Sequence, residues 1–338
     1  PLLAAKKSFI LVCPPPGGEV HPIRQLLKKL LPGIEANAFD LDTEIGSTLV
    51  QTTAIALAHQ PLPPTPRVIE LDKPVNLGDA AQSYTTLNEL FNDPALFVLK
   101  RVAGLEPTPV LTAEEDNRLL GTLAHRVFEK LFAHADALTW TNAQAVGWFR
   151  AEADALLLTE GAVLLMQGAG VSQQHFRKVC EGAIGSLLDH LRSAGATQVQ
   201  TEVDFSGTLG AVPLFGKIDL LVTLGDNRTV AIDMKWRGHN YYASLLRSGE
   251  HLQLAIYSSL IEQTSGTAPA ALGYFILESG ALYITGAEIF PSAQVRRPPE
   301  GVTVGTLLQR AKATWNWRKG QLDAGVVDVV PANPGDEL

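Results

Sequence analysis

Hydrophobic residues recur at helical spacing through the second quarter of the chain. This periodicity predicts four helices, over Tyr84–Val102, Ala113–Ala135, Ala143–Leu165 and Gln173–Ala194. Thr112 and Glu115 stand where a capping box would begin the second helix, because each side chain can pair with the other's free backbone N–H. Leu120, Leu123 and Val127 then follow as a stripe that must face a core.

The pattern then changes to the alternation typical of strands. Segments rich in β-branched and aromatic residues predict four strands, over Val199–Phe205, Val212–Thr223, Thr229–Met234 and Leu272–Leu277. Leu224–Arg228 supplies a Gly-Asp-Asn turn between the second and third strands. Further helices are expected over Tyr241–Thr264 and Val304–Leu322. The order predicts an α/β fold in which helices flank a mixed central sheet.

The N-terminal stretch has a different pattern. We expect a small α/β segment, with a strand over Ser8–Cys13, a Pro/Gly turn and a helix over Ile23–Leu31. The turn lacks the Gly-Lys-Ser/Thr of a phosphate-binding loop and is interpreted as an ordinary turn. Five prolines between Gln60 and Asn76 indicate a linker. We therefore expect residues 1–76 to precede a domain over 77–330 and a frayed tail over 331–338.

Composition and charge restrict the partners. The formal net charge of −8 argues against binding nucleic acid by bulk electrostatics, so any such contact must be local or shared with a partner. No run of about 18 apolar residues predicts a membrane span, and we expect a cytoplasmic protein. The 2 cysteines have no metal-ligand spacing. Since the chain starts at Pro1 instead of Met, we expect a piece of a longer protein.

Two aspartates are the main candidates for chemistry. Asp219 ends Gly-Lys-Ile-Asp, and Asp233 begins Asp-Met-Lys on the next predicted strand. Antiparallel pairing would place both carboxylates side by side at one end of the sheet. Crowded carboxylates repel, so either one is protonated or a cation lies between them. Magnesium prefers such oxygen ligands and keeps waters, one of which could attack a phosphodiester.

Lys235 lies two residues after Asp233, so strand alternation sends both side chains to the same face. An ammonium there could orient the nucleophile or stabilise charge on phosphoryl oxygens. The carbonyl of Met234 could add a metal oxygen. An isolated Asp-x-Lys is weak evidence, since strands often end in solvated charges.

The order of these residues resembles the RecB-like nucleases of the PD-(D/E)XK superfamily. The resemblance covers about Ser83 to Ile284 and includes a helical lead-in with Pro94. The matching residues are Gly121, His125, Glu202, Gly216, Asp219, Asp233, Lys235, Gln253 and Tyr257.

The resemblance implies a restriction-endonuclease-like core and a Mg²⁺- or Mn²⁺-dependent site. It implies His125, Asp219, Asp233 and the Met234 carbonyl as metal ligands, and Lys235 as the catalytic lysine. Relatives that hold an iron–sulfur cluster have a cysteine where this chain has Asp93, so no cluster is expected.

Three further site residues are implied less directly. Glu202 could support the site through water or the metal shell. Gln253 and Tyr257, four residues apart on one helix face, could steady Lys235 or contact the DNA backbone. Arg237 and Tyr241 are candidate DNA contacts, although aromatic residues at a helix start usually serve packing.

The resemblance implies a deoxyribonuclease, more an exonuclease than an endonuclease. Its setting would be the nuclease module of a RecB/AddB-like helicase–nuclease in double-strand-break repair and recombination, with a helicase partner gripping the DNA. Residues 1–76 could then be the remnant of a preceding helicase-like domain. A catalytically silent DNA-binding scaffold and a free-standing exonuclease remain alternatives.

Overall fold

The computed structural model describes residues 29, 67–105, 117–285 and 289–329. Two compact units divide between Pro64 and Thr65, and the fold below belongs to the second. Several predictions lie outside the described residues. They are the N-terminal strand, the N-terminal helix except for Lys29, the capping box at Thr112 and the tail.

A six-stranded mixed sheet forms the centre of this unit, in the order β2-β3-β4-β5-β6-β7. The pairs β4–β5 and β6–β7 are parallel and the others antiparallel. The four predicted strands are confirmed as β2 to β5, whereas β6 and β7 were not predicted. The strands span Ala196–Leu209, Val212–Leu224, Thr229–Lys235, Ala271–Ile276, Ala281–Ile284 and Gln294–Val295.

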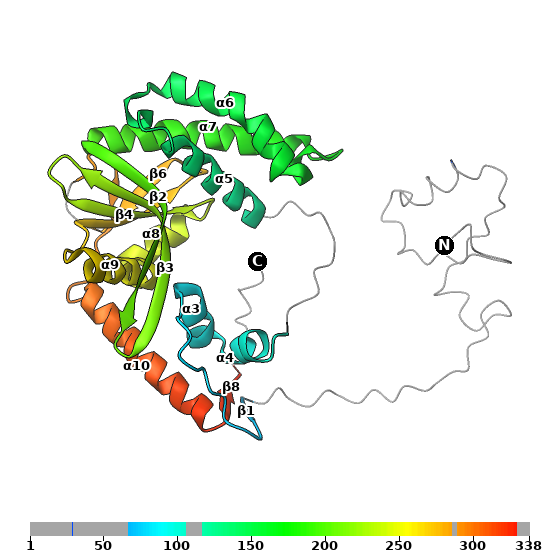
Figure 1. The fold of residues 1–338 in the computed structure, drawn as a ribbon, viewed down its shortest axis with the longest axis vertical. Coiled ribbons are helices and arrows are strands. Elements are labelled where there is room, and N and C mark those ends of the chain that lie inside the picture. The colour runs from blue at the N-terminus through cyan, green and yellow to red at the C-terminus, as the bar shows by residue number, and fades with distance from the viewer. Residues whose placement is uncertain (1–28, 30–66, 106–116, 286–288, 330–338) are drawn as a thin grey trace. The chain divides into compact units, whose positions relative to one another are not determined.

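Helices cover both faces of the sheet (Figure 1). On one face α5 (Asn117–Phe132), α6 (Asn142–Thr159) and α7 (Gly170–Ser193) bury the largest apolar cluster against β3 to β6. On the other, α8 (His239–Ser248) and α9 (Leu252–Ser265) pack on a second cluster. This arrangement confirms the predicted sheet flanked by helices.

The helix predicted over Tyr84–Val102 is divided. Its parts are α3 (Tyr84–Asn92), α4 (Pro94–Phe97) and a π-helical turn, η2 (Val98–Val102). Pro94 has no N–H to continue α3. The carboxylate of Asp93 instead accepts from the backbone N–H of Leu96 at 2.9 Å and so caps α4.

The single long helix expected over Tyr241–Thr264 is wrong. Two helices, α8 and α9, are separated at Gly249, which has a φ of 71°. This left-handed conformation suits glycine and ends α8. A Cβ at Gly249 would also lie 2.6 Å from Cγ1 of Val302. Glycine at this position therefore both ends α8 and leaves room for Val302.

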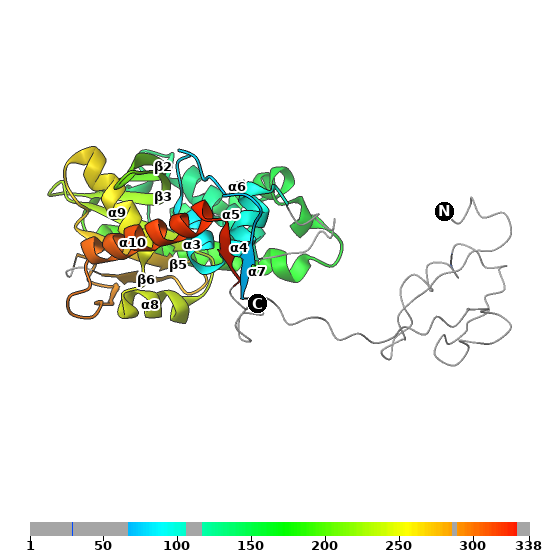
Figure 2. The same ribbon diagram turned by 90° about the horizontal axis from the view of Figure 1, so that it is seen from below.

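Part of the expected linker is a strand. Val68–Glu70 forms β1, which pairs antiparallel with β8 (Val326–Asp328). Arg318 on α10 (Val304–Asp323) supports this pair, because it contacts Oδ2 of Asp328 at 2.6 Å and the Phe91 carbonyl at 3.1 Å. Figure 2 shows α10 lying across α9 and α3. These ties join the two ends of residues 67–329.

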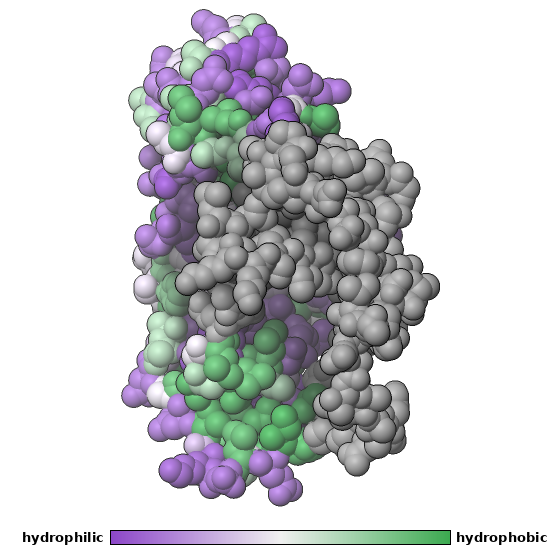
Figure 3. Space-filling model, turned by 90° about the vertical axis from the view of Figure 1, so that its right-hand side faces the viewer, coloured by the Kyte–Doolittle hydropathy of each residue, from purple (hydrophilic) through white to green (hydrophobic). Residues whose placement is uncertain are grey.

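An apolar area lies on the lower part of the surface in Figure 3, where Figure 1 places α4 and β1. Among the exposed large hydrophobic residues, Leu96 lies on α4, Leu99 and Val102 lie on η2, and Leu105 follows them. Among the described residues, no helix combines the length and apolar character needed to cross a membrane.

Gly216 allows β3 to lie directly against α9. A Cβ there would meet Cδ1 of Leu260 at 2.9 Å and Cε1 of Tyr257 at 3.3 Å. We therefore expect Gly216→Ala to destabilise the fold by about 1–3 kcal/mol through overpacking. Thermal unfolding should show a melting temperature lower by several degrees, at about 2–4 °C per kcal/mol.

Gly182 offers a matched control. It lies exposed on α7, and a Cβ there would meet no atom within 4 Å. Gly182→Ala should therefore leave stability unchanged or raise it slightly, since alanine has the better helix propensity. Equal melting temperatures for Gly216→Ala and the parent chain would contradict the close approach of β3 and α9.

Candidate active site

Asp219 and Asp233 lie on neighbouring antiparallel strands. The register pairs Leu220 of β3 with Ile232 of β4, so its continuation places the two aspartates opposite one another. Oδ2 of Asp219 accepts from the Met234 N–H at 2.6 Å. Both residues are buried, with exposed fractions of 8% and 1%. Burial and the adjacent Asp233 carboxylate raise the pKa of Asp219 to about 7.

Lys235 shares the strand face of Asp233, as the alternation predicts. Its Nζ lies 2.8 Å from Oδ2 of Asp233 and 5.6 Å from the centre of the Tyr242 ring. Burial favours the neutral amine, but Asp233, Tyr242 and Asp219 together outweigh it and raise the pKa of Lys235 above its ordinary value. The lysine is therefore a fixed positive charge at the end of β4.

Gln253 and Tyr257 share one face of α9. Nε2 of Gln253 donates to Oδ1 of Asp233 at 2.7 Å and to Oη of Tyr257 at 3.0 Å. Tyr257 itself is 7% exposed. The pair thus holds the Asp233 carboxylate, whereas the sequence suggested a contact with Lys235 or with DNA. Burial, with the nearby Asp233 and Asp219, raises the pKa of Tyr257 and keeps its hydroxyl neutral.

His125 reaches the carboxylates from α5. Its Nδ1 lies 3.3 Å from Oε1 of Glu202 and 3.6 Å from Oδ1 of Asp219, while Nε2 lies 3.2 Å from the Met234 carbonyl oxygen. Burial favours the neutral ring, but the hydrogen bond to Glu202 and the aspartate charges outweigh it and raise the pKa of His125 to about 9. One turn earlier, a Cβ at Gly121 would meet the Cβ of Trp236 at 3.8 Å, an ordinary van der Waals distance, so the packing there leaves room for a small side chain.

Glu202 adopts an unusual backbone conformation on β2. Its φ is 52°, in the left-handed region that residues other than glycine rarely occupy. Regular pairing with β3 is interrupted at Glu202, which lies between the pairs Thr201–Leu220 and Val203–Ile218. The side chain contacts His125, and Lys217 lies 3.7 Å from its Oε2. The hydrogen bond to His125 holds the pKa of Glu202 below its ordinary value.

One group among the described residues has the donors of a metal site: His125, Glu202 and Asp219, whose ligand atoms all lie within 4.8 Å of one another. Two carboxylates and an imidazole suit Mg²⁺, Mn²⁺ or a related divalent ion. Asp233 stands beside this group, but its oxygens contact Gln253 and Lys235. The structure therefore places Glu202 among the candidate metal ligands, whereas the sequence indicated only a supporting role through water or the metal shell.

The rim of the site carries exposed residues. Lys217, which the sequence reasoning missed, lies two residues before Asp219 with its side chain 54% exposed. The same alternation that linked Asp233 to Lys235 could have identified it. Arg237 is exposed and lies 2.7 Å from the Asn117 side-chain oxygen when that amide is oriented toward it. Tyr241 is 61% exposed.

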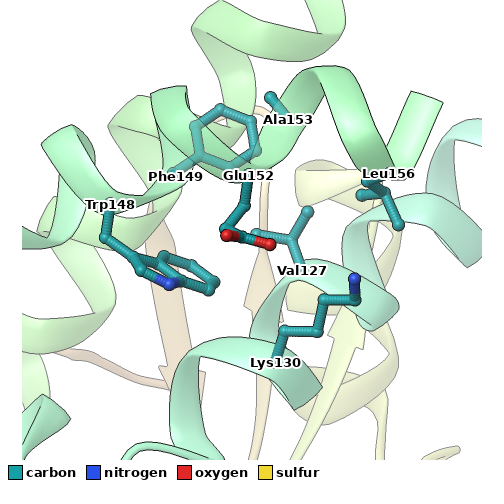
Figure 4. A pocket seen from close by; sticks show the side chains of 7 residues that line it. All are labelled: Val127, Lys130, Trp148, Phe149, Glu152, Ala153 and Leu156. Carbon is teal, nitrogen blue, oxygen red and sulfur yellow. The ribbon is translucent and has the colours of Figure 1, made fainter. Parts of the chain in front are cut away.

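A separate hollow lies between α5 and α6 (Figure 4). None of its lining residues belongs to the site described above. The residues that line it are Val127, Lys130, Trp148, Phe149, Glu152, Ala153 and Leu156.

Two solved structures share a distant likeness with this chain. A candidate exonuclease from Eubacterium rectale is 11% identical, with a TM-score of 0.41 over 73% of this chain and 84% of that one. Protein VC1899 from Vibrio cholerae is 13% identical, with a TM-score of 0.21 over 65% of this chain and 58% of that one. These values are too low to support an argument.

The family comparison is decisive. No curated protein matches the sequence. The sequence profile of the PD-(D/E)XK nuclease superfamily, however, matches residues 81–330. That range contains the whole sheet and every residue of the carboxylate site. The chain therefore belongs to the PD-(D/E)XK nuclease superfamily.

Proposed function

We propose that this chain is a Mg²⁺- or Mn²⁺-dependent deoxyribonuclease that hydrolyses phosphodiester bonds. The observation that carries the proposal is the convergence of His125, Glu202 and Asp219 beside the Asp233–Lys235 pair. A divalent cation, when bound, polarises a phosphoryl oxygen of the substrate and lowers the pKa of a water molecule bound to the cation. The donor set of this site fits such a cation.

The chain's own residues have distinct tasks in this proposal. His125, Asp219 and Asp233 hold the cation together with the Met234 carbonyl, and Glu202 joins them. Lys235 directs its positive charge toward the phosphoryl oxygens, where negative charge grows during the reaction. Gln253 fixes the Asp233 carboxylate, and Tyr257 fixes Gln253. Arg237 and Tyr241 are the candidate DNA contacts because both are exposed at the rim.

We further propose an exonuclease in the cytoplasm, working as the nuclease module of a RecB/AddB-like helicase–nuclease in double-strand-break repair and recombination. The net charge of −8 fits this setting, since a helicase partner would supply much of the DNA grip. Residues 1–76 would be the remnant of a preceding helicase-like domain. A silent scaffold is disfavoured because the candidate ligands converge. A free-standing exonuclease would need no partner for activity.

Cleavage assays test the activity directly. The purified chain is incubated with linear single- and double-stranded DNA in Mg²⁺, in Mn²⁺ and in EDTA. We expect degradation that needs the metal, and end-labelled products that shorten progressively from a terminus. Absence of cleavage together with absence of Mn²⁺ binding in calorimetry would favour the scaffold. Internal cuts in circular DNA would contradict exonuclease action.

Glu202→Gln tests the part of the site that the sequence left open. The substitution keeps the shape and removes one charge from the candidate ligand group. We expect Mn²⁺ affinity in calorimetry to fall about 10- to 100-fold, as for other residues that support a metal site. Glu181→Gln is a suitable control, because Glu181 pairs with Arg150 on the surface. Unchanged Mn²⁺ affinity in Glu202→Gln would remove Glu202 from the metal site.

A further inference from the structure

Three tyrosine rings next to Lys235 form a continuous row of ring contacts. Tyr274 on β5 is 1% exposed, and its ring centre lies 4.8 Å from that of Tyr242. Tyr242 in turn meets Tyr241 edge to face, with centres 5.0 Å apart and planes at 82°. Tyr241 ends the series at the surface, with 61% of its area exposed. The rings thus lead from the core past the lysine to solvent.

This row of tyrosine rings is held in place from several sides. Nζ of Lys235 lies over the Tyr242 ring at 5.6 Å. Gly238, with a φ of 99°, is the N-cap residue just before α8, and a Cβ there would lie 3.2 Å from Cε2 of Tyr242. Tyr242 therefore packs against backbone as well as against Tyr274. Because Tyr241 leans on a fixed ring, it presents an aromatic surface with little freedom to lose on binding.

The lead-in helix approaches the same place. Tyr84 begins α3 and is partly buried in the cluster that α3 shares with α9 and α10. Burial is the main cause that raises the pKa of Tyr84, and the neighbouring Tyr241 hydroxyl adds to it. Elements far apart in the sequence thus bring aromatic side chains to the Lys235 side of the site.

We propose that Tyr241 stacks on an unpaired base of single-stranded DNA whose neighbouring phosphate lies at Lys235. This inference rests on the proposed function and specifies its substrate: a single strand or the unpaired end of a duplex. Inside a duplex the base faces are covered by the neighbouring pairs, so away from a terminal pair only an unpaired base can offer its face to the ring. Stacking is possible with any base, so it does not depend on sequence. It adds affinity for DNA that this acidic chain cannot gain from overall positive charge.

A binding assay in EDTA tests the inference without any cleavage. The probe is an oligonucleotide that contains 2-aminopurine, used single-stranded or annealed to its complement, and stacking on a ring quenches its fluorescence. We expect quenching with the single strand only. Tyr241→Ala should weaken single-strand binding about 5- to 150-fold and abolish the quenching, in line with the loss of one stacked base.

Two further variants make the test specific. Tyr241→Phe keeps the ring and should bind and quench nearly as the parent chain does. Trp317→Ala removes an equally exposed aromatic residue, 54% exposed on α10, and should change nothing. The inference is overturned if the parent chain does not bind the single strand. It is also overturned if Tyr241→Ala weakens single strand and duplex alike, or if Phe and Ala behave the same.

The outcome is separable from that of the proposed function. Cleavage of the same oligonucleotide in Mn²⁺ is measured with the parent chain and with Lys235→Ala. Normal Mn²⁺-dependent cleavage without an effect of Tyr241→Ala on binding would overturn only the stacking. Loss of binding in Tyr241→Ala from a parent chain that cleaves nothing would support the stacking and count against the nuclease.

Discussion

Lys235→Ala should reduce metal-dependent cleavage by at least about 10²–10³-fold, the usual effect of removing a preorganised group that stabilises charge in a transition state. The structure supports this size because the Lys235 ammonium is held 2.8 Å from Asp233 and is kept protonated there. Single-turnover cleavage of a labelled oligonucleotide in Mn²⁺ measures the effect on the chemical step. Mn²⁺ calorimetry on the same variant shows whether binding survives.

Lys319→Ala is the control for loss of an ion-paired lysine. Lys319 pairs with Asp323 at 2.6 Å on α10, but both side chains are largely exposed. Its removal should leave cleavage unchanged. The Lys235 variant also deprives Asp233 of its cation, so some loss of thermal stability is expected. Cleavage by Lys235→Ala at the parent rate would refute the catalytic assignment, whatever the change in melting temperature.

Asp219→Asn should also abolish cleavage, and with it Mn²⁺ binding in calorimetry. Asparagine retains the shape and an oxygen that can accept from the Met234 N–H, now 2.6 Å from the aspartate. It lacks the negative charge that the His125–Glu202–Asp219 group would give to a cation. A substitution so conservative separates the role of charge from that of packing. Retained Mn²⁺ affinity would contradict the assignment of Asp219 as a ligand.

The same variant has a second consequence, for stability without metal. The pKa of Asp219 in the folded chain is raised to about 7. At a pH above the lower pKa that this group has in the unfolded chain, its ionisation therefore opposes folding. In EDTA the wild-type chain therefore loses stability as the pH rises toward 7, and asparagine avoids that loss. Asp219→Asn should melt at a higher temperature than the parent chain at pH 8, by a margin that shrinks at pH 5.

A lower melting temperature for Asp219→Asn at pH 8 would contradict the crowding of the two carboxylates. The exposed pair Arg228–Asp226 provides a control for removal of an aspartate, since Asp226 lies in the turn after β3. Asp226→Asn should show neither the loss of Mn²⁺ binding nor the dependence of the melting-temperature gain on pH.

Much of the site followed from short-range pattern. Strand alternation fixes Asp233 and Lys235 on one face, and a spacing of four fixes Gln253 beside Tyr257 on one helix. A hairpin turn between two predicted strands was enough to place Asp219 opposite Asp233. These relations depend on the geometry of one element or of one strand pair, so the sequence contains them.

Other features could not be read locally. The close approach of Gly249 to Val302, which leaves no room for a Cβ at the break between α8 and α9, joins residues more than fifty positions apart. β1 gains its partner only from β8 at the other end of the domain. The left-handed conformation of Glu202 has no signal in the sequence, since non-glycine residues rarely adopt it.

By itself, then, the sequence determined the α/β order of elements, the carboxylate pair with its lysine, and the family to which they point. The resemblance implied that His125 joins Asp219, whereas the tertiary structure alone decided that Glu202 contacts His125 and that Gln253 holds Asp233. It alone also brought the three tyrosine rings into contact beside Lys235. The division has a physical cause: periodicity sets which face a side chain occupies, whereas packing between distant elements sets which other side chains it meets there.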